Sequence, residues 1–510
     1  MIKEERLNRS KAYKRIKKNV DILSSSNRTM EDIFNISFSY EKFTIFNQVK
    51  DGSLINITYS EAKRHIEQFA NYFSSQIKEC TKYVGLLLDN SPEWIYSYYG
   101  LLMAGFVPVL LSTASTDQDN IGILKDLGAD VVIADKNFAL KSINPYEIKE
   151  SSSIKEKKWA NGTVFVTSGT SGKSKIYLYT GEELSDQLIN VYGLMKDRPM
   201  FLSFYKGYIK QYLVLPLYHI FGFTAGFLWF TFFNVTVVLP QSLAPDHIRE
   251  GALLGEPTHL LAVPLFWEHI AKKVLSAVKE NNAEKKFAKA LRISTRIQSR
   301  NPRRGARFVK NVLFKGFIDK ILGKSLQFCI TGGTAISEET LKIINGLGYP
   351  LVNGYGSTEI AISSFVNPKT IKFRNSLSIG EPFRNYKYSL NKQHELCVVT
   401  NAGYNSALID GKFVERDKNV PIETNDICEI EFDKYFIKGR LDEIFVGKNG
   451  ENYSLPKIEK SLMSNLATDT VCVSCHGKMA LVLSYDKNIP HNLIKKDLSN
   501  IIHNENFTKY

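Results

Sequence analysis

Alternating strand and helix signals in the first third of the chain limit the fold more than any other feature. Short apolar runs typical of buried strands occur at 83–88, 107–111 and 130–135. Segments with helical spacing lie among them, one with Ser60 as a candidate cap and another with Pro92 in its first turn. Buried strands separated by helices predict an α/β fold with a parallel sheet, which binds ligands where its strands end.

Length and composition bound the class of protein. The chain has 510 residues, of which 44% are hydrophobic and 23% charged, so a disordered chain, a collagen or a disulfide-stapled miniprotein is excluded. Six cysteines in a chain of this length suit a reducing compartment. The amino-terminal segment 1–19 is charged and no apolar run follows it, so we expect a cytoplasmic protein rather than a secreted one.

The run 211–245 contains no Asp, Glu, Lys or Arg and is long enough to cross a membrane. Pro216, Gly222 and Gly226 interrupt it, however, and its end is rich in β-branched residues. We therefore expect a buried strand, a loop, a helix and a second buried strand.

The segment TVFVTSGTSGKSK, 163–175, is the strongest local signal for chemistry. Its apolar strand runs into a loop of Ser, Thr, Gly and Lys, in which backbone N–H groups, hydroxyls and an ammonium group can surround phosphate oxygens. Gly172-Lys173-Ser174 match the end of the nucleotide-binding pattern G-x4-G-K-[ST], but Thr167 stands where its first glycine belongs. A flexible linker is the alternative reading.

Two further glycine-rich turns carry polar residues. In VNGYGSTE, 352–359, an aromatic ring between glycines can stack on a base, and a hydroxyl beside a carboxylate can hold a phosphate and Mg²⁺. ITGGTAIS, 330–337, is another strand followed by a glycine turn. His219 stands alone in the apolar stretch 215–223, where a hydrogen-bonded core histidine is the simpler interpretation.

The sequence C-V-S-C-H at 472–476 has the spacing of a haem-attachment site. It lies within DTVCVSCHGKMALVLSYD, which alternates like a pair of strands. We therefore expect strand cysteines here, without haem or metal.

Together these segments resemble adenylate-forming enzymes, the family of acyl-CoA synthetases, luciferases and peptide-synthetase adenylation domains. LPLYHIFG, TGGTAIS, NGYGSTE, TND (424–426) and GRLDE (439–443) follow one another in the order of that family's motifs. The stretch 264–330 and the segment GKNGENYSLPKIE, 447–459, are most similar to long-chain fatty acyl-CoA synthetases.

The resemblance implies a reaction in two steps: a carboxylate attacks the α-phosphate of ATP to give acyl-AMP, and a thiol, usually CoA, then displaces AMP. It assigns the β- and γ-phosphates to the loop residues Thr167, Ser168, Gly169, Thr170, Ser171, Gly172 and Lys175. It assigns Thr358 to the α-phosphate, and Glu359 together with Thr170 to Mg²⁺.

The remaining roles follow from the same resemblance. The resemblance implies that Tyr355 stacks on the adenine base and that the residues lining the base are Asn353, Gly356, Gly333 and Thr334. Asp426, assisted by Arg440, binds the ribose hydroxyls, and His219 lies by the carboxylate of the acid. Asp442 marks the hinge of a carboxyl-terminal lid.

Three departures from the family pattern affect these expectations. Ser174-Lys175-Ile176 replaces Pro-Lys-Gly, and Asn425 replaces the glycine of Thr-Gly-Asp, a mild change because Asn tolerates glycine-like backbone angles. The sequence ends at NENFTKY, where the family's lid has a glycine-lysine loop. We therefore expect a shortened lid and slow acyl-AMP formation, with no such role assigned to Lys509.

The net charge of +14 is concentrated in two segments. Residues 271–324 carry 16 Lys or Arg against 3 Asp or Glu, and residues 1–19 carry 8 against 2, so the remainder is slightly acidic. This distribution argues against nucleic acid as a partner. Solvated helix faces are one interpretation, and a patch for anionic lipid headgroups, an acidic carrier protein or ligand phosphates is the other.

The expected protein is thus an α/β ligase with a large domain, 1–438, of two α/β sheets plus a small β unit, and a truncated α+β lid, 439–510. It activates a fatty or similarly apolar acid with ATP and Mg²⁺ and transfers it to CoA, with the aromatic side chains of 211–245 providing the apolar pocket. Two alternatives stay open: an acyl carrier protein as the acceptor, and a non-catalytic relative that binds acid or nucleotide. Contact with an anionic membrane through 271–324 is a further expectation.

Overall fold

The computed structural model describes residues 11–148, 158–167, 174–197, 208–446, 452–455, 459, 466–475 and 478–502. Its contacts divide the chain into two compact units: Met1–Tyr388 with Val398–Ile422, and Ser389–Cys397 with Glu423–Tyr510. Gly439, the expected boundary, lies within a strand of the second unit. The division into 1–438 and 439–510 therefore remains a prediction about where a lid turns.

The first unit contains an eight-stranded sheet in the order β19-β18-β8-β7-β4-β3-β5-β6. Strands β7 to β6 are parallel, whereas β8, β18 and β19 pair antiparallel at one side. The bounds are β3 (Tyr83–Leu87), β4 (Val107–Leu110), β5 (Val131–Ala134), β6 (Lys141–Ile143), β7 (Gly162–Thr167), β8 (Lys175–Thr180), β18 (Ser406–Ile409) and β19 (Lys412–Glu415). The three strands expected in the first third are confirmed, and each is almost wholly buried.

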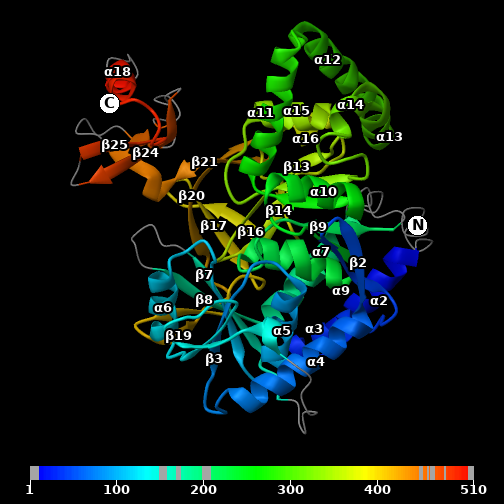
Figure 1. The fold of residues 1–510 in the computed structure, drawn as a ribbon, viewed down its shortest axis with the longest axis vertical. Coiled ribbons are helices and arrows are strands. Elements are labelled where there is room, and N and C mark those ends of the chain that lie inside the picture. The colour runs from blue at the N-terminus through cyan, green and yellow to red at the C-terminus, as the bar shows by residue number, and fades with distance from the viewer. Residues whose placement is uncertain are drawn as a thin grey trace. The chain divides into compact units, whose positions relative to one another are not determined.

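A nine-stranded sheet, β15-β14-β13-β12-β11-β9-β10-β1-β2, completes the first unit (Figure 1). Its six central strands run parallel, and β14, β15 and β2 are antiparallel edges. The bounds are β1 (Thr44–Lys50), β2 (Ser53–Thr58), β9 (Lys210–Leu213), β10 (Thr236–Leu239), β11 (His259–Ala262), β12 (Phe328–Thr331), β13 (Leu351–Ser357), β14 (Ala361–Phe365) and β15 (Glu381–Pro382). Two α/β sheets were expected, and the fold class is confirmed.

Helices cover these sheets and mostly begin where the sequence predicts. Helix α5 (Pro92–Met103) starts at Pro92, with the Ser91 side chain accepting a hydrogen bond from the Trp94 N–H. Helix α4 (Tyr59–Gln76) is capped by Thr58, which forms a capping box with Glu61, so the expected cap at Ser60 is wrong by two residues. Further helices described before residue 264 include α2 (Lys11–Ser25), α3 (Met30–Ser37), α6 (Asp117–Asp126), η1 (Pro145–Glu147), α7 (Gly181–Asp197) and α10 (Pro245–Gly255).

The charge-free run folds as expected into β9, a loop, the helices η2 (Phe221–Leu228) and α9 (Trp229–Phe232), and β10. In the part of the chain that the structure describes, no helix combines the length and apolarity that a membrane span needs. Most of its aromatic rings belong to the core: Phe223 packs edge-on against Tyr98 and Phe165, at centroid distances of 5.0 and 5.5 Å. These rings join η2 to the strand β7 that precedes the loop 168–173.

The basic segment forms a helical layer on the nine-stranded sheet (Figure 1). Its elements are α11 (Pro264–Glu280), α12 (Glu284–Arg300), α13 (Pro302–Phe308), η3 (Val309–Leu313) and α14 (Lys315–Ile318), and α15 (Glu338–Gly346) and α16 (Ile371–Arg374) lie beside them. Trp267 is fully buried in the apolar cluster under this layer. The layer is therefore part of the first unit's core and not an appendage.

The second unit consists mainly of strands, as expected beyond residue 390. A four-stranded sheet, in which β16 and β17 belong partly to the first unit, has the order β16-β17-β20-β21, with bounds β16 (Tyr386–Leu390), β17 (Glu395–Thr400), β20 (Ile422–Glu431) and β21 (Lys434–Arg440). The elements after it are η4 (Leu441–Glu443), β22 (Ile444–Val446), β23 (Asn452–Ser454), β24 (Ala467–Cys475), β25 (Lys478–Tyr485) and α18 (His491–Ile502). Strands β24 and β25 pair antiparallel, which confirms the strand pair expected around Cys472.

Candidate functional site

The strands β7 and β8 flank the loop in which a phosphate site is expected. They pair antiparallel from Gly162 opposite Thr180 to Thr167 opposite Lys175. Thr167 is half-buried and Lys175 is exposed, so both strand ends open toward solvent. The loop residues Ser168, Gly169, Thr170, Ser171 and Gly172 lie outside the described residues.

Thr358 and Glu359 form the tip of the hairpin between β13 and β14. A glycine is required at 356, because a Cβ atom there would lie 2.2 Å from the carbonyl oxygen of Ala361. Ala361 itself has a φ of 52°, which completes the tight turn. The glycine in NGYGSTE therefore fixes the direction in which the hydroxyl and the carboxylate emerge.

Two tyrosines of β8 hold this tip. The Tyr177 hydroxyl donates to Glu359 Oε1 at 3.0 Å, and the Tyr179 hydroxyl donates to the Thr358 carbonyl oxygen at 2.6 Å. The backbone N–H of Tyr404 donates to the Glu359 carbonyl oxygen at 3.0 Å. Burial, together with the Glu359 charge, raises the pKa of Tyr177 well above its usual range, so this hydroxyl stays protonated as a donor.

Lys175, Tyr177 and Tyr179 alternate along β8 and so lie on one face of the strand. Since Tyr177 contacts Glu359, the hairpin tip lies on the same side of the eight-stranded sheet as Lys175, the first residue of β8. No Lys, Arg or His among the described residues forms an ion pair with Glu359. The carboxylate thus retains charge that a bound cation can neutralise.

The residues expected around a base meet at the ends of β12 and β13. Gly333 has a φ of 95°, and a Cβ atom at the neighbouring Gly332 would lie 3.1 Å from the Gly354 carbonyl oxygen. Asn353 donates its side-chain amide to the Ser378 carbonyl oxygen at 3.2 Å. Thr334 is exposed beside Gly333.

A narrow cavity of about 30 Å³ adjoins these turns. Its wall includes Tyr355 and Gly356 on one side and Phe221 and Trp229 of the charge-free run on the other. The volume is that of one or two water molecules. Phe223, Phe227, Phe232 and Phe233 are buried and do not line this cavity, so the expectation that the aromatic rings of the run form the pocket for the acid stays a prediction.

His219 is exposed, so the interpretation as a buried core histidine is wrong. It precedes η2, and its carbonyl oxygen accepts from the Phe223 N–H at 2.8 Å. Asn90 clamps the segment before it, donating to the Leu215 carbonyl oxygen at 2.7 Å and accepting from the Leu217 N–H at 2.9 Å. Although the side chain reaches solvent, desolvation by its apolar neighbours lowers the pKa of His219, which favours the neutral ring.

In the second unit, Asp426 and Arg440 face each other across β20 and β21. Arg440 Nη1 donates to Asp426 Oδ1 at 3.2 Å, and its Nε donates to Asp442 Oδ1 at 3.0 Å. Asn425 has a φ of 60°, the glycine-like angle that its place in the motif demands. The Glu395 carboxylate accepts from the Asn425 N–H at 2.7 Å and fixes this turn.

Sequence reasoning missed Tyr177, Tyr179 and Asn90. The signal for the tyrosines is present in KIYLYT, because period-two spacing after the loop puts both on one face of β8. Asn90 has no such signal, because its partners lie more than 120 residues away in sequence. No cluster of three His, Cys, Asp or Glu suited to a metal occurs among the described residues, so a metal here would rely on Glu359 plus ligand oxygens.

Curated relatives of this chain include long-chain fatty acid–CoA ligases. The ligase ACSBG2 of Gallus gallus is 22% identical over 507 residues, which covers 86% of this chain and 64% of that protein. Long-chain-fatty-acid–CoA ligase 2 of Schizosaccharomyces pombe is 25% identical and covers 63% and 49%. The chain thus spans between half and two thirds of the length of these relatives.

Solved structures share the fold. The o-succinylbenzoate-CoA synthetase MenE of Bacillus subtilis, in complex with its acyl-adenylate intermediate, matches with a TM-score of 0.67 at 16% identity. That match covers 92% of this chain and 91% of MenE. The family model of AMP-binding enzymes matches residues 41–404, which contain β7, β8, the hairpin tip and the turns around the cavity. By this match the chain belongs to the AMP-binding enzyme family.

Proposed function

We propose that this chain is an adenylate-forming ligase that joins an apolar carboxylic acid to a thiol at the expense of ATP. The observation that carries the proposal is the link between β8 and the hairpin tip, in which Tyr177 and Tyr179 hold Glu359 and Thr358. Lys175, which follows a segment rich in hydroxyls and glycine, lies on the same side of the sheet as Glu359, a carboxylate without an ion-pair partner among the described residues. This combination suits a nucleoside triphosphate and its metal.

In the first step an oxygen of the acid's carboxylate bonds to the α-phosphorus of ATP, and the bond from that phosphorus to the pyrophosphate oxygen breaks. The Thr358 hydroxyl binds an α-phosphate oxygen, and the loop 167–175 holds the β- and γ-phosphates. Neutral His219 lies by the incoming carboxylate and adds no charge that would weaken its attack. Such chemistry depends on positioning and on stabilising developing charge.

Glu359 is the residue that would hold Mg²⁺, with Thr170 as a further ligand. Mg²⁺ commonly binds one or two carboxylates together with substrate phosphates, and when bound it neutralises phosphate charge. The Tyr177 hydroxyl occupies one oxygen of Glu359 and leaves the other for a cation.

Asp426 would bind the ribose hydroxyls, with Arg440 fixing its carboxylate from the neighbouring strand. Tyr355 would stack on adenine beside Asn353, Gly356, Gly333 and Thr334. In the second step a thiol sulfur attacks the acyl carbonyl, AMP leaves, and a thioester forms. A turn of the lid 439–510 at Asp442 between the two steps belongs to the same proposal.

The proposed acid is apolar, and most consistent with a fatty acid: Ile220, Phe221 and Trp229 give the cavity beside Tyr355 an apolar wall, although at about 30 Å³ it must widen to take an acyl chain. The names of the curated relatives point the same way. CoA is the proposed acceptor, and the pantetheine thiol of an acyl carrier protein is the alternative.

Mass spectrometry of the products formed from ATP, Mg²⁺, a mixture of fatty acids and CoA tests this proposal. We expect AMP, pyrophosphate and the thioesters of apolar acids. Replacing CoA by holo acyl carrier protein separates the two acceptors. Absence of AMP with either thiol, while ATP still binds, would favour a non-catalytic relative and overturn the proposal.

A further inference from the structure

The positive charge of the helical layer is arranged in a stripe. Five cations on α12 recur at intervals of four, three, four and four residues and therefore share one face: Lys285, Lys289, Arg292, Arg296 and Arg300. We call them the basic stripe. All five are exposed, whereas Phe287, Ser294 and Gln298 of the same helix are buried.

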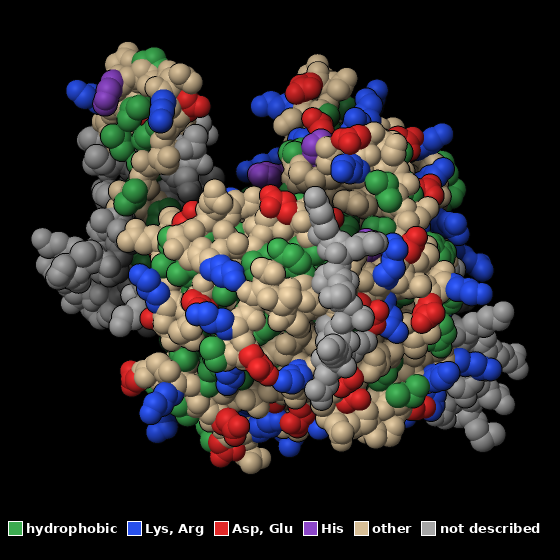
Figure 2. Space-filling model, turned by 60° about the horizontal axis from the view of Figure 1, so that its bottom comes forward, with side chains coloured by type: hydrophobic (Ala, Val, Ile, Leu, Met, Phe, Trp, Pro, Cys, Tyr) green, Lys and Arg blue, Asp and Glu red, His purple; other side chains and the backbone are tan. Residues whose placement is uncertain are grey.

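The basic stripe has no acidic counterpart within the described structure. None of its five side chains forms an ion pair with a described carboxylate. Like charges one turn apart destabilise a helix, so this arrangement is costly unless an anionic partner offsets it. Elsewhere on the first unit the charges are mixed: Figure 2 shows acidic and basic side chains interspersed over the lower part of the face it presents.

Apolar side chains are exposed on the adjoining helices. Phe308 is 51% exposed, Val312 61% and Leu313 37%, and we call these three residues the apolar wedge. They end α13 and form the exposed side of η3, which packs against α12. Arg304, Arg307 and Lys315 flank them and are exposed as well.

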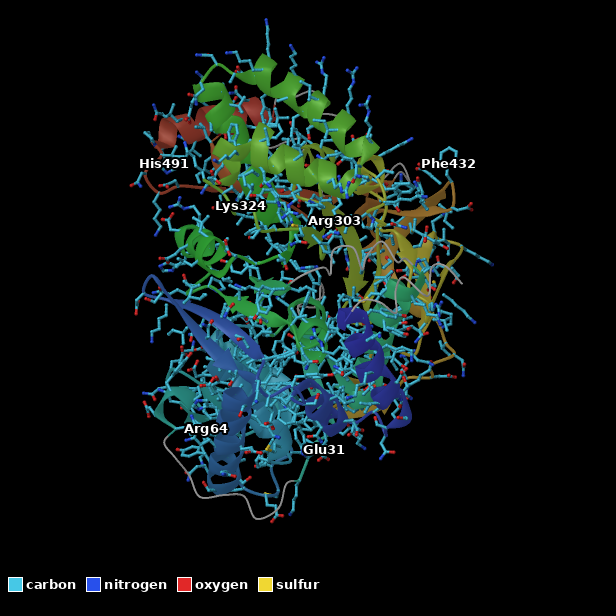
Figure 3. All side chains as sticks on the ribbon, turned by 90° about the vertical axis from the view of Figure 1, so that its right-hand side faces the viewer. Glu31, Arg64, Arg303, Lys324, Phe432 and His491 are labelled. Atoms are coloured by element: carbon cyan, nitrogen blue, oxygen red, sulfur yellow. The ribbon has the colours of Figure 1, made fainter. Side chains whose placement is uncertain are left out.

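Arg303 and Lys324, which bracket the apolar wedge in sequence, lie in one part of the first unit. In Figure 3, Arg303 and Lys324 lie in the upper half with the green helices, whereas Arg64 of α4 and Glu31 of α3 lie in the lower half. Single exposed apolar residues are common on protein surfaces and need no explanation. Three within six positions, bracketed by cations on a segment that packs against the helix of the basic stripe, give the helical layer both chemical features of a membrane-interface helix.

We propose that this helical layer binds the surface of an anionic lipid bilayer. The basic stripe contacts negatively charged headgroups, and the apolar wedge enters the boundary between headgroups and acyl chains. A nucleic acid would satisfy the charge but would leave the apolar wedge in water, and an acidic protein would have to present an apolar patch beside its carboxylates, whereas an anionic bilayer supplies both features over any area. The charge and the exposure of these side chains are the observations behind the proposal. Binding to a bilayer would bring the protein to the membrane, into which long apolar acids partition.

Co-sedimentation of the full chain with vesicles tests the proposal directly. Vesicles of phosphatidylcholine mixed with phosphatidylglycerol should bind the protein at low salt, and pure phosphatidylcholine vesicles should not. High salt should release most of the bound protein, because exposed charges are screened. Equal binding to both vesicle types would overturn the proposal.

Matched variants separate the two parts of the surface. Arg292→Gln with Arg296→Gln should weaken binding roughly tenfold or more, whereas Arg64→Gln with Lys125→Gln, two exposed cations outside the layer, should change it less than twofold. Val312→Ser should weaken binding several-fold, and Val414→Ser, at a valine that is 49% exposed on β19, should not.

A melting curve for each variant verifies that it folds. Stripe and control variants that bind vesicles equally would overturn the proposal. So would capture of an acidic acyl carrier protein in the absence of any vesicle binding, which would assign the surface to a protein partner. Because sedimentation requires no turnover, failure here leaves the proposed reaction untouched, and failure of the reaction leaves this surface untouched.

Discussion

Two carboxylates of this chain, one in each compact unit, are held in opposite ways. Glu359, at a hairpin tip of the first unit, accepts a hydrogen bond from the neutral hydroxyl of Tyr177. Asp426, on a strand of the second unit, is paired with the guanidinium of Arg440. Both follow a residue with a constrained backbone, Gly356 in one case and Asn425 in the other.

The difference indicates what each carboxylate can bind. A neutral donor orients Glu359 without cancelling its charge, which suits a metal ion. The guanidinium of Arg440 balances the negative charge of Asp426. The Asp426 carboxylate is therefore suited to accept hydrogen bonds from neutral groups such as the hydroxyls of ribose. We therefore expect the loss of each carboxylate to have a distinct signature.

The largest effect should follow from Glu359→Gln, which keeps the shape of the side chain and removes its charge. We expect the rate of AMP formation at saturating acid and CoA to fall roughly 10²–10³-fold, because charge at the reacting phosphates is no longer balanced. Glu339→Gln, at an exposed glutamate of α15, is the matched control. A variant that retains the wild-type rate would remove Glu359 from the site.

Asp426→Asn should weaken ATP binding by about 1.5–3 kcal/mol, the usual contribution of a hydrogen bond to a charged group. The magnesium concentration needed for half-maximal activity should stay unchanged. Calorimetric titration with ATP, together with a magnesium titration of the rate, measures both. A changed magnesium requirement in this variant would contradict the claim that Glu359, and not Asp426, serves the metal ion.

Tyr177→Phe should lower the rate about tenfold, because Glu359 loses the donor that orients it. The raised pKa of Tyr177 keeps the wild-type hydroxyl protonated, so the ratio of wild-type to variant rates should be constant from about pH 7 to pH 10. A ratio that falls toward one near pH 10 would mean that the pKa of Tyr177 is not raised and that the hydroxyl is not a permanent donor to Glu359. Tyr179→Phe, which frees only a backbone carbonyl of Thr358, serves as the comparison.

The smallest effect concerns the turn before Asp426. Asn425→Ala should destabilise the second unit by roughly 1 kcal/mol, because its φ of 60° is unfavourable for a residue with an ordinary side chain. Asn425→Gly should be close to neutral. Hydrogen exchange of the β20 and β21 amides reports this difference, and equal protection in the two variants would contradict it.

Much of the fold could be predicted from the sequence because its signals are local. The strands of the first third, Pro92 at the start of α5 and the interrupted apolar run all follow from neighbouring residues. The cap of α4 was misplaced because both Thr58 and Ser60 are good caps, and only the reciprocal bond to Glu61 selects the first.

The candidate site was predicted less completely, because its hydrogen bonds join distant segments. Tyr177 and its hydrogen-bond partner Glu359 are 182 residues apart in the sequence, and Asn90 and its partner Leu215 are 125 residues apart. The role of the aromatic run could not be predicted for a related reason: composition indicates that rings such as Phe223 are buried, but not whether they face a ligand or the core.

Calorimetric titration of ATP over a range of Mg²⁺ concentrations, with the wild type, Glu359→Gln and Asp426→Asn, tests the central claim most directly. We predict that wild-type affinity rises with Mg²⁺, and that Asp426→Asn shows the same dependence at lower affinity. We predict that Glu359→Gln loses most of the dependence. A Glu359→Gln variant with the wild-type magnesium dependence would contradict the assignment of the metal to the hairpin tip.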